Sequence, residues 1–520
     1  MSAGSLDFRD RERQLNALDG ASFDLIVIGA GITGAGVARD AAMRGLSVAL
    51  VEARDIASGT SSRSSKMIHG GLRYMAQGDL SLVQEAATER KAVEQIAPHL
   101  TRLTPFVIPA KNVAGLAKLR AGLWAFEKLG AVPKDRHHEV WSRRDLAQRE
   151  PAISLETTEG AVAYPEYLTN DARLTLANVR SAVAHGAQVI TYAPVESLIF
   201  ENGRAIGVVI GDALAGSAHS ARARLNGKLI VNAAGPWVDA IRRLEAAGAE
   251  TRLQLTKGVH VCVPREKLPV ERTIIMPAAD RRSVFAVPGG EVTYLGTTDT
   301  FYEVADLWPT VELADVQYLL DAASRRFSTR PLGFADITAV WSGVRPLVAQ
   351  AGKGASEISR KDEVWMGPAG VLAIAGGKLT AYRKMAERIV DLAQETLGQR
   401  PSPCRTAIDP LIGGDLDPVA AVAAHGQRLV GLYGSEAADV GCGPADEARH
   451  AVLHEGALTL EDYWVRRGAR AWFDADGGAS ALKPAATAMA ALLGWTAART
   501  AAEVTAATEH QQLPRQPVDA

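Results

Sequence analysis

The chain has 520 residues, more than one hydrophobic core usually holds, so two or three domains with room for a large buried cofactor are expected. Its 57 basic and 59 acidic residues nearly cancel, which argues against a nucleic-acid-binding protein with a global positive field. The cysteines Cys262, Cys404 and Cys442 are too widely spaced for a disulfide framework or a zinc site. We therefore expect no metal and a reducing compartment.

The N-terminal segment, residues 1–19, contains no apolar stretch of the signal-peptide type. No later run of about 18 uninterrupted apolar residues predicts a helix that crosses a bilayer. We expect a mobile N-terminal segment and a protein that is soluble or lies on a membrane surface.

Residues 23–52 have the pattern of a βαβ unit. The stretch "FDLIVIG" (23–29) is a short apolar run, typical of a strand that is buried on both faces. The following segment predicts a helix closed by Gly45, and "LSVALVE" (46–52) predicts a second buried strand. A parallel sheet is implied.

Three glycines in this unit, Gly29, Gly31 and Gly34, have the spacing GxGxxG. Such glycines permit a tight turn, the close approach of a pyrophosphate and close packing of helix on strand, with the helix N-terminus facing the phosphates. Glu52, at the end of the second strand, is placed to accept hydrogen bonds from a ribose. The unit indicates dinucleotide binding but does not distinguish FAD from NAD.

The segment that follows is free of acidic residues from position 56 to 78 but contains Arg63, Lys66, His69 and Arg73. Basic side chains gathered directly after a nucleotide site indicate a bound anion. Arg63 and Lys66 could equally lie on a solvated loop, where runs of charge usually occur.

A helix is predicted for residues 116–132, "LAKLRAGLWAFEKLGAV". Its apolar side contains Leu123 and Trp124, and basic residues such as Lys118 and Lys128 border it. The pattern fits either a helix that docks on anionic lipid or an ordinary amphipathic helix of the core.

Two later segments again go from a buried strand into small residues. "GKLIVNAAGPWVD" (227–239) reaches a Gly-Pro turn, so a sheet edge is expected to open there close to the cofactor. Near residue 376 the order is strand, Gly-Gly, helix, and N–H groups at such a helix start can stabilise negative charge on a flavin ring. Between them, residues 250–340 contain short alternating strands typical of an antiparallel sheet. After residue 401 the pattern is helical.

The chain resembles the FAD-dependent respiratory glycerol-3-phosphate dehydrogenases, within the D-amino-acid-oxidase-like flavoproteins. The resemblance is carried by "DLIVIGAGITGAGVARDAAMRGLSVALVEARDIASGTSS", "SSKMIHGGLRY", "NDARLTLANVRSAVAHGAQV", "NAAGPWVD", "LTKGVHVCVPR", "GTTDT", "WSGVRPL" and "GGKLTAYRKMAE", in the expected order between about residues 22 and 395. It implies an α/β protein with a Rossmann-like FAD-binding domain, an α+β substrate or cap domain containing an antiparallel sheet, and a C-terminal helical domain. With the segment patterns, it predicts an FAD-binding domain from 20–100, 155–250 and 340–395, a substrate domain from 100–155 and 250–340, and a helical domain at 401–520.

The resemblance also implies which residues meet the cofactor and the substrate. It implies FAD contacts from Gly29, Gly31, Gly34, Glu52, Thr60, Ser61, Ser65, His69, Gly70, Gly71, Ala234, Gly235, Gly377, Lys378, Leu379 and Thr380. It implies substrate contacts from Arg73, Tyr74, Arg345, Lys378 and Arg360.

The implied reaction is oxidation of sn-glycerol 3-phosphate to dihydroxyacetone phosphate by hydride transfer to FAD. A base must take the hydroxyl proton, and nearby cations such as Arg345 and Lys378 would stabilise the alkoxide-like transition state. His69 is the first candidate for the base, because imidazole titrates near neutrality and its motif borders the ring. His260 is the rival, although a histidine in an alternating strand is more often structural, and Lys378 could assist.

Electron disposal and assembly are expectations from the resemblance alone. They are a quinone as acceptor, peripheral attachment to the inner face of the cytoplasmic membrane, and a homodimer. Oxygen is the alternative acceptor. A related FAD-dependent amine, amino-acid or 2-hydroxy-acid oxidoreductase, and a non-catalytic flavin-binding protein, are the alternative functions.

Overall fold

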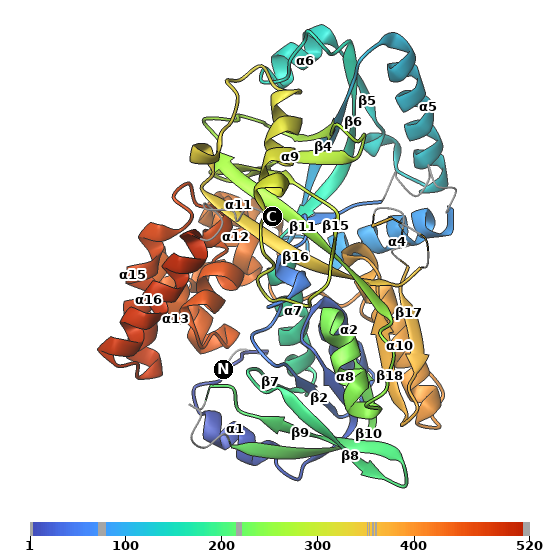
Figure 1. Ribbon diagram of the computed structural model, residues 1–520, viewed down its shortest axis with the longest axis vertical. Coiled ribbons are helices and arrows are strands. Elements are labelled where there is room, and N and C mark those ends of the chain that lie inside the picture. Colours follow the sequence, from blue (N-terminus) through green and yellow to red (C-terminus); the bar gives the residue numbers. More distant parts are fainter. Residues whose placement is uncertain are drawn as a thin grey trace.

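The computed structural model of the protein describes residues 4–70, 80–214, 221–350, 352, 354–355, 358 and 361–512. Two large β-sheets and a group of C-terminal helices make up the molecule (Figure 1). In that view the first sheet lies below the second, and the C-terminal helices, coloured orange and red, lie to one side.

The first sheet has a parallel centre, as the βαβ pattern predicts. Its strands in spatial order are β17 (Glu363–Met366), β18 (Val371–Ala375), β10 (Arg222–Asn232), β1 (Ser22–Ile28), β2 (Val48–Val51) and β7 (Gln188–Ile190), with β9 (Arg204–Gly211) paired to β10 and β8 (Val195–Glu201) paired to β9. The strands from β18 to β7 run parallel, and β17 is antiparallel to β18. The carboxyl ends of the parallel strands therefore share one edge, where ligands bind in such sheets.

Both faces of the first sheet are covered, which explains why β1 is apolar at consecutive positions. Helices α2 (Ile32–Met43), α7 (Asp171–Ala184) and α10 (Tyr382–Thr396) share one apolar core with the sheet. Helices α1 (Arg11–Leu18) and α8 (Val238–Glu245) contribute to the core on the other face.

The second sheet is almost entirely antiparallel. Its strands in spatial order are β15 (Thr300–Tyr302), β11 (Leu253–Pro264), β14 (Val292–Gly296), β13 (Ser283–Gly289), β12 (Thr273–Pro277), β4 (Thr101–Ala110), β6 (Gly160–Thr169) and β3 (Met67–Ile68), with β16 (Ala339–Val348) on β11 and β5 (Glu139–Ser142) on β6. Helices α6 (Arg143–Arg149) and α9 (Leu313–Ser324) cover one face. The α/β class with an added antiparallel sheet is confirmed.

Three strands depart from the predicted domain boundaries. β3, β6 and β16 lie in segments that we assigned to the nucleotide-binding domain, but they pair in the second sheet. β6 pairs with β4 along its full length, and β16 does the same with β11. These long antiparallel ladders join residues far apart in sequence, and local patterns do not reveal such pairing.

The predicted mobility of residues 1–19 is wrong for the described part, residues 4–19. Leu6 forms a β-bridge with Glu455, and the side chains of Leu6 and Phe8 are buried. Helix α1 follows, with Leu15 and Leu18 in the core. Scattered apolar residues without a clear period carry this packing, so the sequence pattern did not indicate it.

The helical C-terminal domain is confirmed. It consists of α11 (Pro418–His425), α12 (Gln427–Tyr433), α13 (Pro444–Glu455), a π-helical turn η7 (Asp462–Arg467), α14 (Arg470–Phe473), α15 (Ala479–Leu493) and α16 (Ala497–Gln512). Its apolar residues share a core with the second sheet, where the rings of Trp472 and Trp341 lie 5.6 Å apart. Among the described helices, none has the length and hydropathy needed to cross a bilayer.

The predicted amphipathic helix is α5 (Val113–Leu129). It contacts α4 (Leu80–Ile96) and strands β4 and β6 of the second sheet. Leu123 and Phe126 are buried, so this side serves the core. Trp124 is 59% exposed, with Lys128 Nζ 6.0 Å from the centre of its ring. The apolar stripe is therefore mostly a packing face, with one large aromatic side chain left on the surface.

Acid destabilisation through His99 is the first expected result. Burial, together with the nearby Arg173, lowers the pKa of His99 to about 3. The imidazole stays neutral in the folded protein while the unfolded chain binds a proton below about pH 6.5, so this contribution to stability is complete above that pH and is lost as the pH falls. We expect His99→Asn to reduce the drop in unfolding free energy between about pH 7.5 and 5.5 by about 1.4 kcal/mol, measured by urea unfolding. His425→Asn, on the exposed helix α11, should keep the wild-type drop.

Candidate active site

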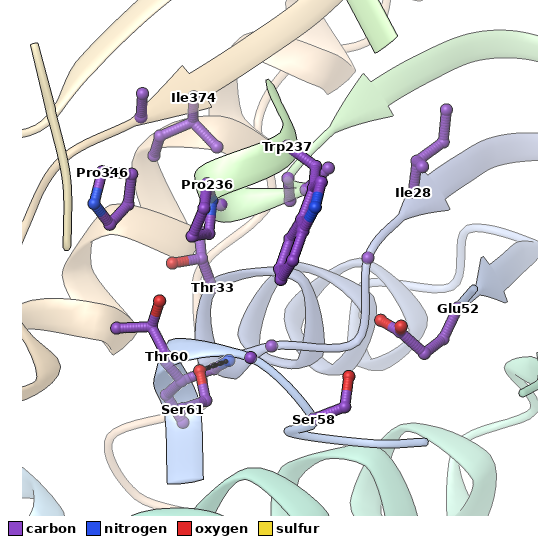
Figure 2. Close-up of a pocket in the computed structure, with 18 of the residues that line it drawn as sticks. Ile28, Thr33, Glu52, Ser58, Thr60, Ser61, Pro236, Trp237, Pro346 and Ile374 are labelled. Atoms are coloured by element: carbon purple, nitrogen blue, oxygen red, sulfur yellow. Dashed lines mark hydrogen bonds between the residues drawn. The ribbon is translucent and has the colours of Figure 1, made fainter. Parts of the chain in front are cut away.

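A long cleft lies at the carboxyl edge of the parallel strands. It is lined from the ends of β1, β2, β10 and β18 and from the segment around Ser58 to Ser61. Figure 2 shows Glu52 towards one end of this cleft, Pro346 and Ile374 towards the other, and Trp237 beside Pro236 along one wall. The position is the one where doubly wound sheets bind nucleotides.

The three predicted glycines form the turn from β1 into α2. Gly29 has a φ of +103°, which side chains other than hydrogen rarely tolerate. Gly31 is the residue before the first turn of α2, and the N–H of the next residue, Ile32, donates to Ser61 Oγ at 2.9 Å. At Gly34 a Cβ would lie 1.9 Å from the carbonyl oxygen of Gly29, so only glycine lets helix and strand come this close.

Gly34→Ala is expected to open this turn and to weaken cofactor binding. The added Cβ meets backbone, which cannot yield as a flexible side chain could, so we expect a loss of several kcal/mol in stability, as for severe overpacking. Thermal unfolding and retention of bound cofactor during gel filtration measure both effects. The matched control is Gly36→Ala in the same helix, where the nearest atom is the Ala386 Cβ at 3.1 Å and a small shift suffices. Equal behaviour of the two variants would contradict the role given to Gly34.

Glu52 is held at the end of β2 by the backbone of two turns. Its Oε2 accepts the N–H of Ala30 at 2.7 Å, and its Oε1 accepts the N–H of Arg54 at 2.9 Å. Burial raises the pKa of this carboxyl, while the two N–H groups act in the opposite direction. Each oxygen keeps a further lone pair for a hydroxyl donor in the cleft, as a ribose-binding acid requires.

A second cavity adjoins the cleft, and the two share part of their lining. Residues that border both are Thr60, Ser64, Pro346, Gly377, Lys378 and Leu379. The second cavity is further lined by Arg63, Ser65, Met67, His69, Gly258, His260, Thr297, Gly343, Arg345, Leu347 and Thr380. It thus brings together the described members of the predicted catalytic group, His69, His260, Arg345 and Lys378.

Arg345 projects from β16 and is held by the strand-end loop after β14. Its Nη1 donates to Asp299 Oδ1 at 3.1 Å, and its Nη2 donates to Thr297 Oγ1 at 3.1 Å and to the carbonyl oxygen of Thr298 at 3.2 Å. Gly258 on the neighbouring strand makes room, since a Cβ there would lie 2.1 Å from Nη2. The guanidinium is therefore oriented by neighbours while it borders the cavity.

Lys378 stands where β18 leads into α10. Gly376 and Gly377 before it have φ values of +79° and +87°, and a Cβ on Gly376 would meet the carbonyl oxygen of Lys361 at 2.6 Å. Lys378 then precedes a short 3₁₀ turn, η5 (Leu379–Ala381), that leads into α10. The side chain borders both cavities, as a group that meets the cofactor and the substrate must.

His69 follows strand β3 and is tied to the same turn. Its backbone N–H donates to Thr380 Oγ1 at 3.2 Å, and that hydroxyl lies 3.3 Å from the His69 carbonyl oxygen. The next residue, Gly70, donates its N–H to Glu166 at 3.0 Å. This pairing sets the imidazole at the border of the second cavity.

His260 lies in β11 and is 1% exposed. Its ring stacks on Trp341 at 4.7 Å, and its Nε2 lies 2.9 Å from Ser65 Oγ. Burial, then the charges of Arg345 and Lys66, hold the pKa of His260 well below its usual value. The imidazole is therefore neutral at physiological pH and can accept a proton only at a cost.

The two uncertain cations of the acid-free run are buried. Lys66 is 3% exposed and its Nζ lies 2.7 Å from Asp171 Oδ1 on α7. Arg63 is also 3% exposed, its guanidinium stacks on Trp308 at 4.3 Å, and it donates to the carbonyl oxygens of Ser58 and Gly59. The interpretation as decoration of a solvated loop is wrong for both residues, because each is buried against a residue far away in the chain, Asp171 for Lys66 and Trp308 for Arg63.

The comparisons with known proteins agree with this geometry. Residues 24–383 match the family model of FAD dependent oxidoreductases, and residues 404–500 match that of the C-terminal domain of alpha-glycerophosphate oxidase. The aerobic glycerol-3-phosphate dehydrogenase of Bacillus subtilis (strain 168) is 37% identical over 504 residues, which cover 89% of this chain and 90% of the relative. The enzyme of the same name from Staphylococcus aureus (strain USA300) is 40% identical over 414 residues, 78% of this chain and 74% of the relative.

The chain belongs to the family of the aerobic glycerol-3-phosphate dehydrogenases. A solved structure, the glycerol-3-phosphate dehydrogenase from Bacillus halodurans complexed with FAD, superimposes with a TM-score of 0.81 at 30% identity and covers 99% of both chains. The cofactor of the present protein is FAD, and the residues that line its cleft fit this cofactor. The glycine turn leaves room for a pyrophosphate, and the N-terminus of α2 faces the cleft. Glu52 lines the cleft at the end of β2, where a ribose-binding acid is expected.

The predicted FAD residues that the structure describes fall into two groups. Those lining the cleft or the second cavity are Gly29, Gly31, Glu52, Thr60, Ser61, Ser65, His69, Ala234, Gly235, Gly377, Lys378, Leu379 and Thr380. Gly34 and Gly70 line neither and act through the backbone around them. Gly71, Arg73, Tyr74 and Arg360 lie outside the described residues.

Several lining residues of the dehydrogenase were not predicted as site residues. Trp237, Pro236 and Ile241 form a wall of the cleft, and Thr297 borders the second cavity. The "GPWVD" motif carried a signal for this wall, because a large aromatic residue directly after a strand and a Gly-Pro turn has to lie beside the sheet edge. Thr297 lies in the "GTTDT" motif of the family resemblance, but its residue type did not mark it, since a threonine in a loop is common.

Proposed function

We propose that the protein oxidises sn-glycerol 3-phosphate to dihydroxyacetone phosphate, with FAD as the hydride acceptor. The observation that carries the proposal is the second cavity, in which Arg345, Lys378 and His69 border one space that joins the cofactor cleft. A phosphorylated alcohol needs fixed cations for its anionic end and a base near its hydroxyl. The relatives of this chain are named for oxidation of this substrate.

We assign the following roles to the side chains. Arg345, oriented by Asp299 and Thr297, donates hydrogen bonds to the substrate, and Lys378 adds positive charge at the border of the two cavities. His69 takes the hydroxyl proton as the C2 hydrogen leaves with its electron pair. FAD supplies the two-electron acceptor beside the substrate when it is bound. Arg73, Tyr74 and Arg360 remain predicted substrate contacts.

The surroundings of His260, the other candidate for the base, favour His69 in that role. His260 is buried between Trp341 and Ser65, and its pKa is depressed by burial and by nearby cations. A strongly depressed pKa makes a weak base, whereas His69 is only partly buried and borders the cavity. His260 then orients Ser65, and Lys378 remains the second candidate for the base.

The test is anaerobic mixing of the purified holoenzyme with glycerol 3-phosphate. Loss of the oxidised flavin band near about 450 nm, followed by stopped-flow absorbance, is the expected result. Glycerol, which lacks the phosphate, should bleach the band far more slowly. Bleaching by an amino acid or a 2-hydroxy acid, with none by glycerol 3-phosphate, would overturn the proposal in favour of the related oxidoreductases.

We further propose that electrons pass to a membrane quinone and that the protein acts as a homodimer on the inner face of the cytoplasmic membrane. The surface of α5 supports the membrane contact, because Trp124 is exposed beside Lys128 and the exposed Lys118. Co-sedimentation with anionic vesicles, compared between wild type and Trp124→Ala, tests the contact. Reduction of a water-soluble quinone analogue and light scattering test the acceptor and the dimer.

A further inference from the structure

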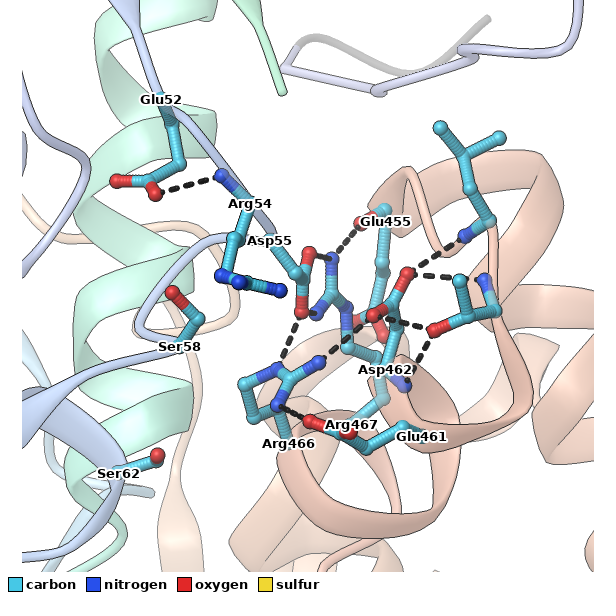
Figure 3. Close-up of polar contacts among 12 residues, drawn as sticks. Glu52, Arg54, Asp55, Ser58, Ser62, Glu455, Glu461, Asp462, Arg466 and Arg467 are labelled. Atoms are coloured by element: carbon cyan, nitrogen blue, oxygen red, sulfur yellow. Dashed lines mark hydrogen bonds and ion pairs between the residues drawn. The ribbon is translucent and has the colours of Figure 1, made fainter. Parts of the chain in front are cut away.

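The loop between β2 and the turn η1 (Thr60–Ser62) borders the cofactor cleft on one side and the C-terminal helices on the other. Glu52, Ser58 and Gly59 line the cleft. Asp55, in the middle of the same loop, is fully buried and turns to the opposite side (Figure 3). The side chain therefore takes no direct part in the cleft, yet it lies three residues from the ribose-binding acid.

Two consecutive arginines of the C-terminal domain meet on this one carboxylate. Arg466 Nε donates to Asp55 Oδ2 at 2.5 Å, while Arg467 donates through Nη2 to Oδ1 at 2.8 Å and through Nη1 to Oδ2 (Figure 3). Both arginines belong to the π-helical turn η7. Neighbouring side chains diverge in an α-helix, so the wider turn suits two adjacent guanidinium groups that converge on one acid.

The arginines are themselves held from behind. Arg466 also donates to Glu461 Oε1 at 2.6 Å and to Asp462 Oδ1 at 2.7 Å, and Arg467 donates to the carbonyl oxygen of Glu455 at 2.8 Å. Burial disfavours the charged form, but the surrounding carboxylates hold the pKa of Arg466 above its usual value. All three side-chain nitrogens of Arg466 and both Nη atoms of Arg467 are hydrogen-bonded, so the network can fix the position of Asp55.

A second contact runs from η7 to the other side of the same loop. Tyr192 donates its hydroxyl to Asp462 at 2.7 Å, and its backbone N–H donates to the carbonyl oxygen of Arg54 at 2.8 Å. The next residue, Ala193, donates its N–H to the carbonyl oxygen of Glu52 at 2.7 Å and lines the cleft. The C-terminal domain therefore reaches the ribose end of the cleft by two routes.

The loop needs such support because its own conformation is strained. Ala57 has a φ of +62°, a region that residues with a side chain rarely adopt. Its N–H donates to the carbonyl oxygen of Ala30, the residue whose own N–H binds Glu52. A strained turn persists when its surroundings over-determine it, and the ion network supplies that constraint.

We propose that the C-terminal helical domain is part of the FAD-binding machinery: Arg466 and Arg467 hold Asp55 and thereby position the 52–59 loop, with Glu52, at the adenosine end of the cofactor. Asp55 and the two arginines are positioning residues, since none of them lines the cleft. The inference requires only FAD and does not depend on which substrate is oxidised.

The experiment measures FAD release from the holoenzyme and the affinity of ADP for the apoprotein, since ADP probes the adenosine end alone. We expect Asp55→Asn to speed FAD release and to weaken ADP binding by about tenfold or more each, as when groups that orient a ligand-binding side chain are lost. Arg467→Lys, which keeps the charge but not the paired donors, should fall between wild type and Asp55→Asn.

The matched control is Glu436→Gln. Glu436 accepts from Arg180 of α7 at 2.5 and 2.8 Å, so it joins the same helical domain to the first domain away from the loop. We expect this variant to lower the melting temperature while FAD release and ADP affinity stay at wild-type values. If Glu436→Gln lowers the affinity for ADP as much as Asp55→Asn does, the network only attaches the domains to each other and the inference fails.

A milder variant keeps the test decisive if Asp55→Asn does not fold. Tyr192→Phe removes one hydroxyl from the network and leaves the backbone contacts of the loop in place. We expect this variant to raise the rate of FAD release and to lower the affinity for ADP, both by the same factor. Wild-type values for both in a folded Tyr192→Phe protein would overturn the proposal for that route, and wild-type values in Arg467→Lys as well would overturn it entirely.

Discussion

Arg345→Ala is expected to leave FAD bound and to slow reduction of the flavin by glycerol 3-phosphate by about a thousandfold, the size of effect seen when a donor to a developing oxyanion is removed. The guanidinium borders the second cavity and is aimed by Thr297, the Thr298 carbonyl and Asp299. The contacts that the structure describes for its guanidinium include the strand-end loop, the substrate contact is our proposal, and the glycine turn and Glu52 line the other cavity. The nucleotide should therefore stay in place.

Stopped-flow absorbance under anaerobic conditions measures this loss, and the visible spectrum of the purified variant reports the bound flavin. Arg345→Lys should recover part of the rate, since it restores charge without the paired donors. Arg265→Ala is the matched control: Arg265 also lies in the second domain but pairs with Glu271 at its surface. Wild-type reduction in Arg345→Ala would remove Arg345 from the reacting site.

The nucleotide cleft was predictable because its parts are local. β1, the glycine turn, α2 and β2 follow one another within about thirty residues, the usual size of one βαβ unit, so apolar periodicity and glycine spacing are enough. Glu52 falls at the end of the unit and was placed by the same pattern. The C-terminal helices were predictable for the same reason, since their period is local.

The parts that sequence patterns missed depend on residues far apart in the chain. Lys66 is buried because Asp171 on α7 reaches it, and Asp55 is buried because η7 folds over it. A run of basic residues looks the same on a solvated loop and in a closed network, since the partners are set by tertiary structure. The pairing of β6 with β4 and of β16 with β11 moved the domain boundaries for a similar reason.

The two histidine candidates for the base differ in how much of their surroundings the sequence could predict. The family motif predicted His69 beside the flavin, and the alternating strand indicated a buried His260. The register of β11 against β16 sets His260 opposite Trp341. Only this register reveals that the imidazole of His260 stacks on Trp341 and is buried near the charge of Arg345. Its low pKa follows from that neighbourhood and could not be read from the strand itself.

His69→Asn is expected to slow flavin reduction by about a hundredfold or more, within the range for loss of a general base, and to remove its dependence on pH near neutrality. If His69 is the base, the wild-type rate rises with pH as the imidazole loses its proton. His260 gives no such rise, because burial and nearby cations hold its pKa well below the usual value and it is already neutral across this range. Reduction rates of wild type and variant between about pH 6 and 8 provide the measurement.

His260→Asn is the matched variant, since it alters an imidazole that borders the same cavity. Loss of its contact with Ser65 should lower the rate while the shape of the pH profile is kept. A His69→Asn protein that retains the wild-type profile would move the base to another group. Lys378, which borders the same cavity, would then be the next candidate, and the pH profile of a Lys378→Met protein would be the measurement that tests it.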